Sequence, residues 1–285
     1  MKVKLPEIAI LLACHNRREK TIRCIKSLVE QQGISETYTV EIFLVDDAST
    51  DGTADQVAQQ FPEVYIIKGD GNLFWSRGMR LAWKTSAEKK EFDFYLWVND
   101  DVIVFPNAIL IMLESNLKAG MNAIICGTTQ SEITQEYTYG GQTRKGKVVI
   151  PNDSLQECVI MNGNFVLISD QVYKKVGMID SFYHHAIGDH DYGLQAIKKG
   201  VKIFIPPGYI GTCEEHESWP TWQLSEIPFK KRLRSLYSPL GNSHPYYFFT
   251  YERRHFGLLV AVKHFLSIHL RLVWPGLWKQ KSSVG

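Results

Sequence analysis

The chain lacks several features that would assign it to a familiar class. Its five cysteines are odd in number, scattered and without a C-x-x-C pair, which argues against a disulfide framework or zinc knuckle and fits a reducing compartment. Its net charge of +2 is too small to indicate nucleic acid as a partner. The N-terminal segment MKVKLPEIAILLAC has a short apolar run and no small-residue cleavage site, so we expect a first strand and a cytoplasmic protein.

Glycine is absent from the first loop that could bind a nucleotide. A dinucleotide-binding domain needs G-x-G-x-x-G after its first strand, and a P-loop needs G-x-x-x-x-G-K-[ST]. The segment ACHNRREK contains neither pattern. It also lacks the glycine- and arginine-rich loop expected of a sugar-phosphate nucleotidyltransferase, which stays the alternative enzyme class.

Strand and helix patterns alternate through the first half of the chain. Short apolar runs predict strands, and apolar residues at helical spacing predict helices between them. The expected strands are 8–14, 38–46, 64–68, 94–98 and 123–128, and the expected helices are 19–32, 48–61, 74–90 and 107–120. This alternation predicts βαβ units and a mostly parallel central sheet.

The regular alternation of strand and helix patterns ends at about residue 130. Residues 136–150 are typical of a hairpin, 158–169 of one or two strands, and 189–200 of a helix. We therefore expect one α/β domain over 1–220, with a nucleotide-binding half (1–128) and a mixed half (129–220). Residues 221–285 are expected to form a C-terminal extension with an amphipathic helix.

Two adjacent acids, Asp100 and Asp101, follow the expected buried strand FYLWV. Burying two unpaired carboxylates is very costly, so a positive group must face them. Ligands of open parallel sheets bind at the carboxyl ends of the strands. A divalent metal such as Mg²⁺ or Mn²⁺ is one candidate for the positive group. A solvated turn, with Asp101 capping the next helix, is the other interpretation.

Five segments in order resemble the signatures of family 2 glycosyltransferases with the GT-A fold. They are LLACHNRREKTIRCIKSL, FLVDDASTDGT, GNLFWSRGMRLAW, LWVNDDV and MNGNFVLISDQVYKKVGMIDSFYHHAIGDHDYGLQAIKKG, and the resemblance covers roughly residues 6–216. It implies a Rossmann-like central sheet with flanking helices. It also implies an inverting enzyme that uses a nucleotide-diphospho-sugar donor.

The resemblance assigns residues to the donor side of the site. His15 stands where the family often has a tyrosine that stacks on the nucleobase, and Asp47 matches the acid that accepts a hydrogen bond from the base. Asp51 is the helix-start residue of the same loop. Arg17 is expected near a phosphate, although an exposed surface role is the alternative.

Trp75 and Arg77 belong to the segment that borders the donor sugar and diphosphate in the family. Trp75 is a candidate for stacking on a sugar face, with core packing as its alternative. Arg77 is a candidate phosphate contact.

The resemblance also assigns metal and base. In the triplet NDD, Asn99 replaces the first acid, Asp101 matches the metal ligand, and Asp100 matches the position near the ribose or a water-mediated metal contact. His216 is the expected second ligand of Mn²⁺ or Mg²⁺.

In GDHDYG, Gly188 replaces the usual glutamate and Asp189 falls on the catalytic base, while Asp191 is expected to be structural. A single well-placed carboxylate can remove the proton of an attacking hydroxyl.

The segment FGLLVAVKHFLSIHLRLVW near the C-terminus is mostly apolar, with Lys263, His264, Ser267 and Arg271 on one helical stripe. These charges count against a membrane-spanning helix and fit an interfacial one. Packing on the protein's own core, or on a second subunit in a homodimer, is the alternative.

We therefore predict a metal-dependent hexosyl- or deoxyhexosyltransferase acting on a saccharide or lipid-linked saccharide in cell-surface polysaccharide or glycolipid assembly. Its expected location is the cytoplasm, with contact to the inner face of the cell membrane. The alternative from another class is a catalytically silent nucleotide- or carbohydrate-binding protein on the same fold.

Overall fold

The structure is a computed structural model that describes residues 4–215, 220–241 and 243–277. The chain forms two compact units. The first comprises Met1–Ser181 and Gly188–Glu215, and the second comprises Phe182–Ile187 and His216–Gly285. The short segment 182–187 thus belongs to the second unit although it precedes the last helix of the first. The expected domain boundary at 220 stays a prediction.

An eight-stranded sheet forms the centre of the first unit, in the order β10-β13-β6-β12-β4-β1-β2-β3. The four strands at the β3 side are parallel to one another. Their bounds are β1 Glu7–Cys14, β2 Thr39–Asp46, β3 Tyr65–Lys68 and β4 Phe94–Val98. The strands at the other side are β6 Ala123–Cys126, β10 Gln156–Cys158, β12 Phe165–Ser169 and β13 Lys202–Ile205. The predicted α/β fold with a large central sheet is confirmed.

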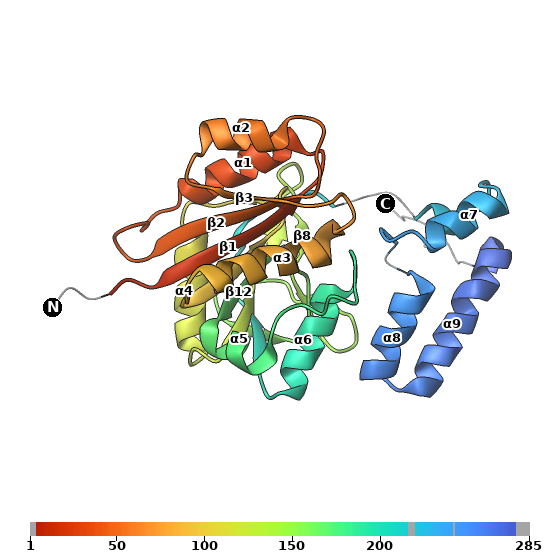
Figure 1. Ribbon diagram of the computed structural model, residues 1–285. Helices are drawn as coiled ribbons and strands as arrows, with labels where there is room; N and C mark the ends of the chain where they lie inside the picture. The colour runs from red at the N-terminus through yellow and green to blue at the C-terminus, as the bar shows by residue number, and fades with distance from the viewer. Residues whose placement is uncertain (1–3, 216–219, 242, 278–285) are drawn as a thin grey trace. The chain divides into compact units, whose positions relative to one another are not determined.

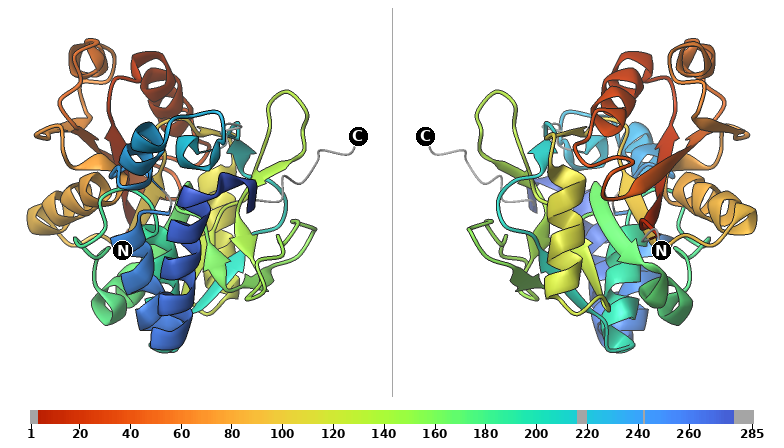
Figure 2. Two further views of the ribbon diagram at one scale, coloured as in Figure 1. Left: turned by 90° about the vertical axis from the view of Figure 1, so that its right-hand side faces the viewer. Right: turned by 90° about the vertical axis from the view of Figure 1, so that its left-hand side faces the viewer.

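Helices cover both faces of this sheet (Figures 1 and 2). One face packs against α1 Arg18–Val29, α2 Thr53–Gln60 and α4 Ala108–Lys118. The other face packs against α3 Phe74–Lys89, α5 Asp170–Val176 and α6 Gly188–Lys198. Alternate residues of β1 point to opposite faces, as in any strand: Ile8 and Ile10 contribute to one core and Ala9 and Leu11 to the other. Burial on both faces explains why β1 is a continuous apolar run.

One or two strands were expected over residues 158–169, but the place of strand β12 in the sheet was not predicted. It lies antiparallel between β4 and β6, with Phe165 opposite Val98. Because the pairing is antiparallel, the residues just before β12 lie beside the residues just after β4. The Asn99 backbone N–H accordingly donates to the Asn164 carbonyl at 2.9 Å.

Smaller sheets complete the first unit. β5 Ile103–Val104, β14 Gly211–Thr212, β7 Thr129–Gln130 and β8 Tyr137–Tyr139 form one, and β9 Gly141–Gln142 pairs with β11 Ile160–Met161. Gln142 also bridges to Val148 around a turn, so the expected hairpin is present in part.

The second unit is helical. Its elements are η1 Thr221–Gln223, α7 Phe229–Leu236, α8 Pro245–His255, α9 Leu258–Val273 and η2 Pro275–Leu277. α8 and α9 pack side by side, and α7 contacts α9 (Figure 2). Trp222, Leu236, Ile268 and Leu272 form its small core. Within the three described stretches, no helix combines the length and apolarity needed to cross a membrane.

Candidate functional site

Polar segments follow β1, β2 and β4 at one edge of the sheet. The strands are parallel and in register, with Cys14 opposite Asp46 and Leu11 opposite Trp97. Their carboxyl ends therefore meet, and the three predicted polar clusters come together in space.

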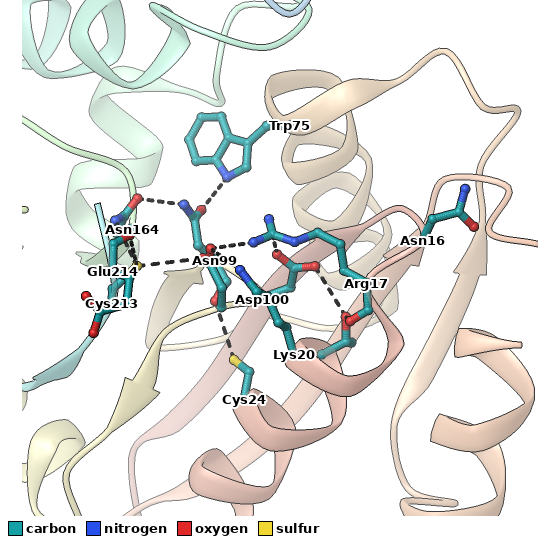
Figure 3. A network of polar contacts seen from close by, with 12 residues as sticks. Asn16, Arg17, Lys20, Cys24, Trp75, Asn99, Asp100, Asn164, Cys213 and Glu214 are labelled. Carbon is teal, nitrogen blue, oxygen red and sulfur yellow. Dashed lines mark hydrogen bonds and ion pairs between the residues drawn. The ribbon is translucent and has the colours of Figure 1, made fainter. Parts of the chain in front are cut away.

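Arg17 is the positive group that faces the two acids. One of its amino groups lies 2.9 Å from the Asp100 carboxylate, and the other forms an ion pair with the Asp101 carboxylate. The Thr21 hydroxyl donates to Asp100 at 3.2 Å, and the Lys20 ammonium lies 3.9 Å from Asp101. Figure 3 shows Arg17 and Lys20 on either side of Asp100. The start of helix α1 thus supplies the charge that these buried acids require.

Burial has the largest effect on the pKa values of Asp100 and Arg17. It raises the pKa of Asp100 to about 7, against the charge of Arg17, while the neighbouring Asp101 raises it further. Burial alone would lower the pKa of Arg17, but the charges of Asp100 and Asp101 raise it above its ordinary value. The Asp100 side chain is 4% exposed, and its two oxygens are directed to Arg17 and Thr21.

Asn99 connects the acids to the rest of the site. Its side-chain oxygen accepts from the Trp75 indole N–H at 2.6 Å, and its amide nitrogen donates to the Asn164 side chain at 2.6 Å (Figure 3). A carboxylate at position 99 could accept from the indole but could not donate. The departure from an acid at this position therefore fits the local hydrogen bonds.

Asp189 lies in the first turn of α6 and reaches the same network. Its two carboxylate oxygens accept from the backbone N–H groups of Gly163 and His190, each at 2.8 Å. Gly163 packs against the indole ring of Trp75, and a Cβ at this glycine would lie 2.5 Å from the ring. Trp75 therefore joins the NDD triplet to Asp189. Its indole is half-buried, so the choice between packing and sugar stacking stays open.

Gly188 fills a position that a side chain could not occupy. A Cβ there would lie 2.4 Å from the buried Ser76 hydroxyl and 3.3 Å from Ile179. The usual glutamate is excluded by this packing. Asp191 is fully buried and accepts from Gln195 at 2.6 Å, in line with the structural role expected for it.

Asp47 holds the loop before α3. Its carboxylate accepts from three backbone N–H groups, those of Gly71 at 2.8 Å and of Leu73 and Phe74 at 2.9 Å. The His15 ring donates to the Asp47 carbonyl at 2.6 Å. The two residues expected at the nucleobase are therefore neighbours, and most of the Asp47 carboxylate is already bonded within the protein.

Arg77 is directed elsewhere. Its guanidinium donates to the Ser181 carbonyl at 3.0 Å. The arginine that the structure places against the acids is Arg17.

Several residues near the site adopt a left-handed backbone although they are not glycine. Asn16, Ala48 and Phe74 have φ values of 51°, 57° and 54°, and Ile187, just before α6, has 76°. Such conformations cost about 1–3 kcal/mol each and often occur at functional sites. They support the assignment of this edge as the site.

Asp101 is the carboxylate of this cluster that could serve as one ligand of a hard divalent cation. Mg²⁺ is commonly held by one or two carboxylates plus substrate phosphates, and Asp101 offers a carboxylate beside two cationic side chains. Cys213 lies 3.8 Å from Asp101, and burial raises its pKa, so it stays a neutral thiol. Across the parts of the chain that the structure describes, no three metal-ligating side chains gather, so substrate oxygens would have to complete the coordination. His216 lies outside the described residues.

An open hollow lies at the start of helix α1. Its volume is about 320 Å³, and its lining comprises Asn16, Arg17, Arg18, Glu19, Lys20 and Asp51. Three of these six side chains are cationic and two are acidic, so the lining has a net charge of +1. Arg17 and Lys20 are the two cations of this lining that also face Asp101.

Sequence reasoning did not single out four members of the network. They are Lys20, Thr21, Asn164 and Cys213. The spacing of Lys20 and Thr21 from Arg17 on one helix was an available signal, whereas Asn164 and Cys213 required the pairing of distant strands.

Comparison with known proteins identifies the family. The family model described as "Glycosyl transferase family 2" matches residues 9–177. The succinoglycan biosynthesis protein ExoO of Rhizobium meliloti is 36% identical over 70 residues, which cover 24% of this chain and 19% of that protein. The chain thus spans about a fifth of the length of this relative.

A solved structure is similar in fold. It is the mannosyltransferase PcManGT from Pyrobaculum calidifontis, in complex with GDP-Man and Mn²⁺, and it matches with a TM-score of 0.56 and 14% identity. The match covers 97% of this chain and 82% of that one. The chain belongs to glycosyl transferase family 2 and has the GT-A fold.

Proposed function

We propose that this glycosyltransferase moves a sugar from a nucleotide-diphospho-sugar to an acceptor hydroxyl, with inversion at the anomeric carbon. The observation that carries the proposal is one contact network that connects Asp101, Asn99, Trp75 and Asp189. It brings an acid suited to a cation and an acid suited to a hydroxyl into one site. The similar Pyrobaculum calidifontis enzyme, in complex with GDP-Man and Mn²⁺, supports this type of donor.

Asp189 would be the general base. The acceptor hydroxyl attacks C1 of the sugar, the bond from C1 to the diphosphate oxygen breaks, and the hydroxyl proton passes to Asp189. The backbone N–H groups of Gly163 and His190 fix its carboxylate and leave further lone pairs for the acceptor. These two donors are backbone groups, so they hold the Asp189 carboxylate in place without the use of a side chain.

The hollow at the start of α1 would receive the diphosphate. Arg17 and Lys20 line it and already form ion pairs with Asp101. A Mn²⁺ or Mg²⁺ ion held by Asp101, with His216 as the second proposed ligand, would stabilise the charge on the leaving diphosphate. Asp101 pairs with Arg17 in the structure, so Arg17 would have to exchange this partner for the diphosphate.

We further propose that the acceptor is a saccharide or a lipid-linked saccharide of a cell-surface polysaccharide or glycolipid. The similarity to ExoO, a succinoglycan biosynthesis protein, supports this class of pathway. The transferred sugar would be a hexose or a deoxyhexose.

A donor screen followed by a base variant tests the proposal. Thermal unfolding with UDP-, GDP- and dTDP-sugars, with and without Mn²⁺, should identify one donor that stabilises the protein. With that donor and an acceptor, Asp189→Asn should abolish nucleoside diphosphate release and leave nucleotide affinity near normal, because the proton acceptor acts mainly in the transition state. Asp170→Asn, a first-turn acid of α5, is the control. Nucleotide binding without any release by the parent protein would identify a silent binder.

A further inference from the structure

Helix α9 carries its large apolar side chains on the outside of the second unit. Leu259, Val262, Leu266, Leu270 and Val273 follow one another at intervals of three or four residues, so they form one stripe. Their exposed fractions lie between 41% and 87%. A helix at the surface of a globular unit ordinarily turns such a stripe toward the core.

The opposite side of α9 is already packed. Ile268 and Leu272 contribute to the small core of the unit, and His264 pairs with the buried Glu252 of α8. His269 also bonds to the Tyr237 hydroxyl at 2.7 Å. His264 and His269 therefore serve internal contacts, while the apolar stripe is left outside.

Helix α7 adds positive charge to the same unit. It packs on α9 through Leu236, which lies in the core with Ile268 and Leu272. Its Lys230, Lys231 and Arg234 are exposed, together with Phe229 at 48%. The exposed surface of this short helix thus carries both apolar and basic side chains.

The second unit is strongly basic as a whole. Residues 220–277 contain eight lysines and arginines and two glutamates, whereas the entire chain has a net charge of only +2. A second copy of the unit would bring like charges together at an interface. An anionic partner that also accepts apolar side chains suits this surface better.

We infer that the second unit binds the surface of an anionic lipid bilayer through the α9 stripe, with Lys230 and Lys231 of α7 adding electrostatic attraction. The stripe would enter the boundary between headgroups and acyl chains, as interfacial helices do, and the lysines would meet anionic headgroups. Lys263 and Arg271 have stems long enough to bring their charges to the headgroups. This inference is independent of the chemistry proposed for the first unit.

Vesicle co-sedimentation of the full chain tests the inference. Vesicles of phosphatidylcholine alone are compared with vesicles that contain about one-third phosphatidylglycerol, without donor or metal. The parent protein should bind the anionic vesicles more tightly, and Leu259→Glu/Leu266→Glu should lower the partition coefficient about tenfold or more, because each leucine would lose its apolar contact. Lys230→Gln/Lys231→Gln should lower binding to anionic vesicles only, and added salt should do the same.

Matched controls separate this surface from general effects. Leu117→Glu/Ile133→Glu changes two exposed apolar residues of the first unit, at 67% and 84%, and Lys145→Gln/Lys147→Gln removes two exposed lysines there. Both controls should bind vesicles like the parent, and circular dichroism should show all variants folded. Equal effects of test and control pairs, or no binding by the parent protein, would overturn the inference. So would a dimer in light scattering that the α9 variant dissociates without any vesicle binding.

Discussion

Replacing Arg17 by alanine should destabilise the protein in a pH-dependent way. Arg17 lies 2.9 Å from the Asp100 carboxylate and pairs with Asp101, and Asp100 is almost fully buried. A neighbouring arginine typically changes the pKa of an acid by about 1–3 units, and each unit corresponds to about 1.4 kcal/mol. Loss of the guanidinium should therefore cost about 1.4–4 kcal/mol where Asp100 is ionised.

The direction of the pH effect follows from the raised pKa of Asp100, about 7 in the folded protein. Because its folded pKa is above its unfolded value of about 4, the stability that Asp100 contributes is present at low pH and is lost as the pH rises through 7. Near pH 5, Asp100 is protonated in both folded proteins, so the part of the cost that comes from Asp100 is small there. Above pH 7 the parent is ionised and gains from Arg17, and the cost grows by up to about 1.4 kcal/mol per pH unit until Asp100 of the variant is ionised as well.

Denaturant unfolding at about pH 5.5, 7 and 8.5, followed by tryptophan fluorescence, measures this cost. Arg23→Ala is the matched control, since Arg23 lies on the same helix and pairs with the exposed Glu132. The control should change the free energy of unfolding by less than about 1 kcal/mol at every pH. A loss for Arg17→Ala that equals the control, or one that does not grow with pH, would refute the reasoning.

Four further outcomes are expected. Mn²⁺ should stabilise Arg17→Ala more than the parent in thermal unfolding, because the guanidinium no longer competes for Asp101; equal shifts would contradict this. Asn99→Asp should lower the free energy of unfolding by about 1–3 kcal/mol, since the donor to Asn164 is lost; an unchanged denaturation midpoint would show that this bond contributes nothing. Gly188→Ala should cost about 1–3 kcal/mol by overpacking. Adding Ser76→Gly to Gly188→Ala should recover part of that cost, because the crowding side chain is removed. If the stability losses of the two single variants simply add in the double variant, the two positions are not in direct contact.

The sequence predicted much of the fold because its signals are local. The continuous apolar run of β1 arises because both faces of the sheet are covered. The helical spacing of apolar residues in α1 arises because one side of that helix packs on the sheet. The register of parallel strands then brings their polar ends together without further information. Asp51 also has the predicted helix-start role, since it accepts from the Thr53 backbone and hydroxyl at 3.1 and 2.5 Å.

The partners within the site could not be predicted in this way. The sequence required a positive group opposite Asp100, and either a metal or a side chain would meet that requirement; only the pairing of β1 with β4 brings Arg17 there. Likewise, Asn164 reaches Asn99 because β12 inserts antiparallel beside β4, which no local pattern indicates. The orientation of α9 could not be predicted either. Apolar residues recur at helical spacing on both of its sides, so the spacing alone does not tell which side packs on the unit.

Calorimetric titration of the selected nucleoside diphosphate, with and without Mn²⁺, tests the central claim most directly. The claim is that Asp101 would hold a cation, which would stabilise the charge on the diphosphate. The parent protein should bind the nucleotide tightly only with Mn²⁺, and Asp101→Ala should weaken that binding about tenfold or more, because a charge-bearing ligand is lost. Binding that ignores Mn²⁺, or that Asp101→Ala leaves unchanged, would contradict the account.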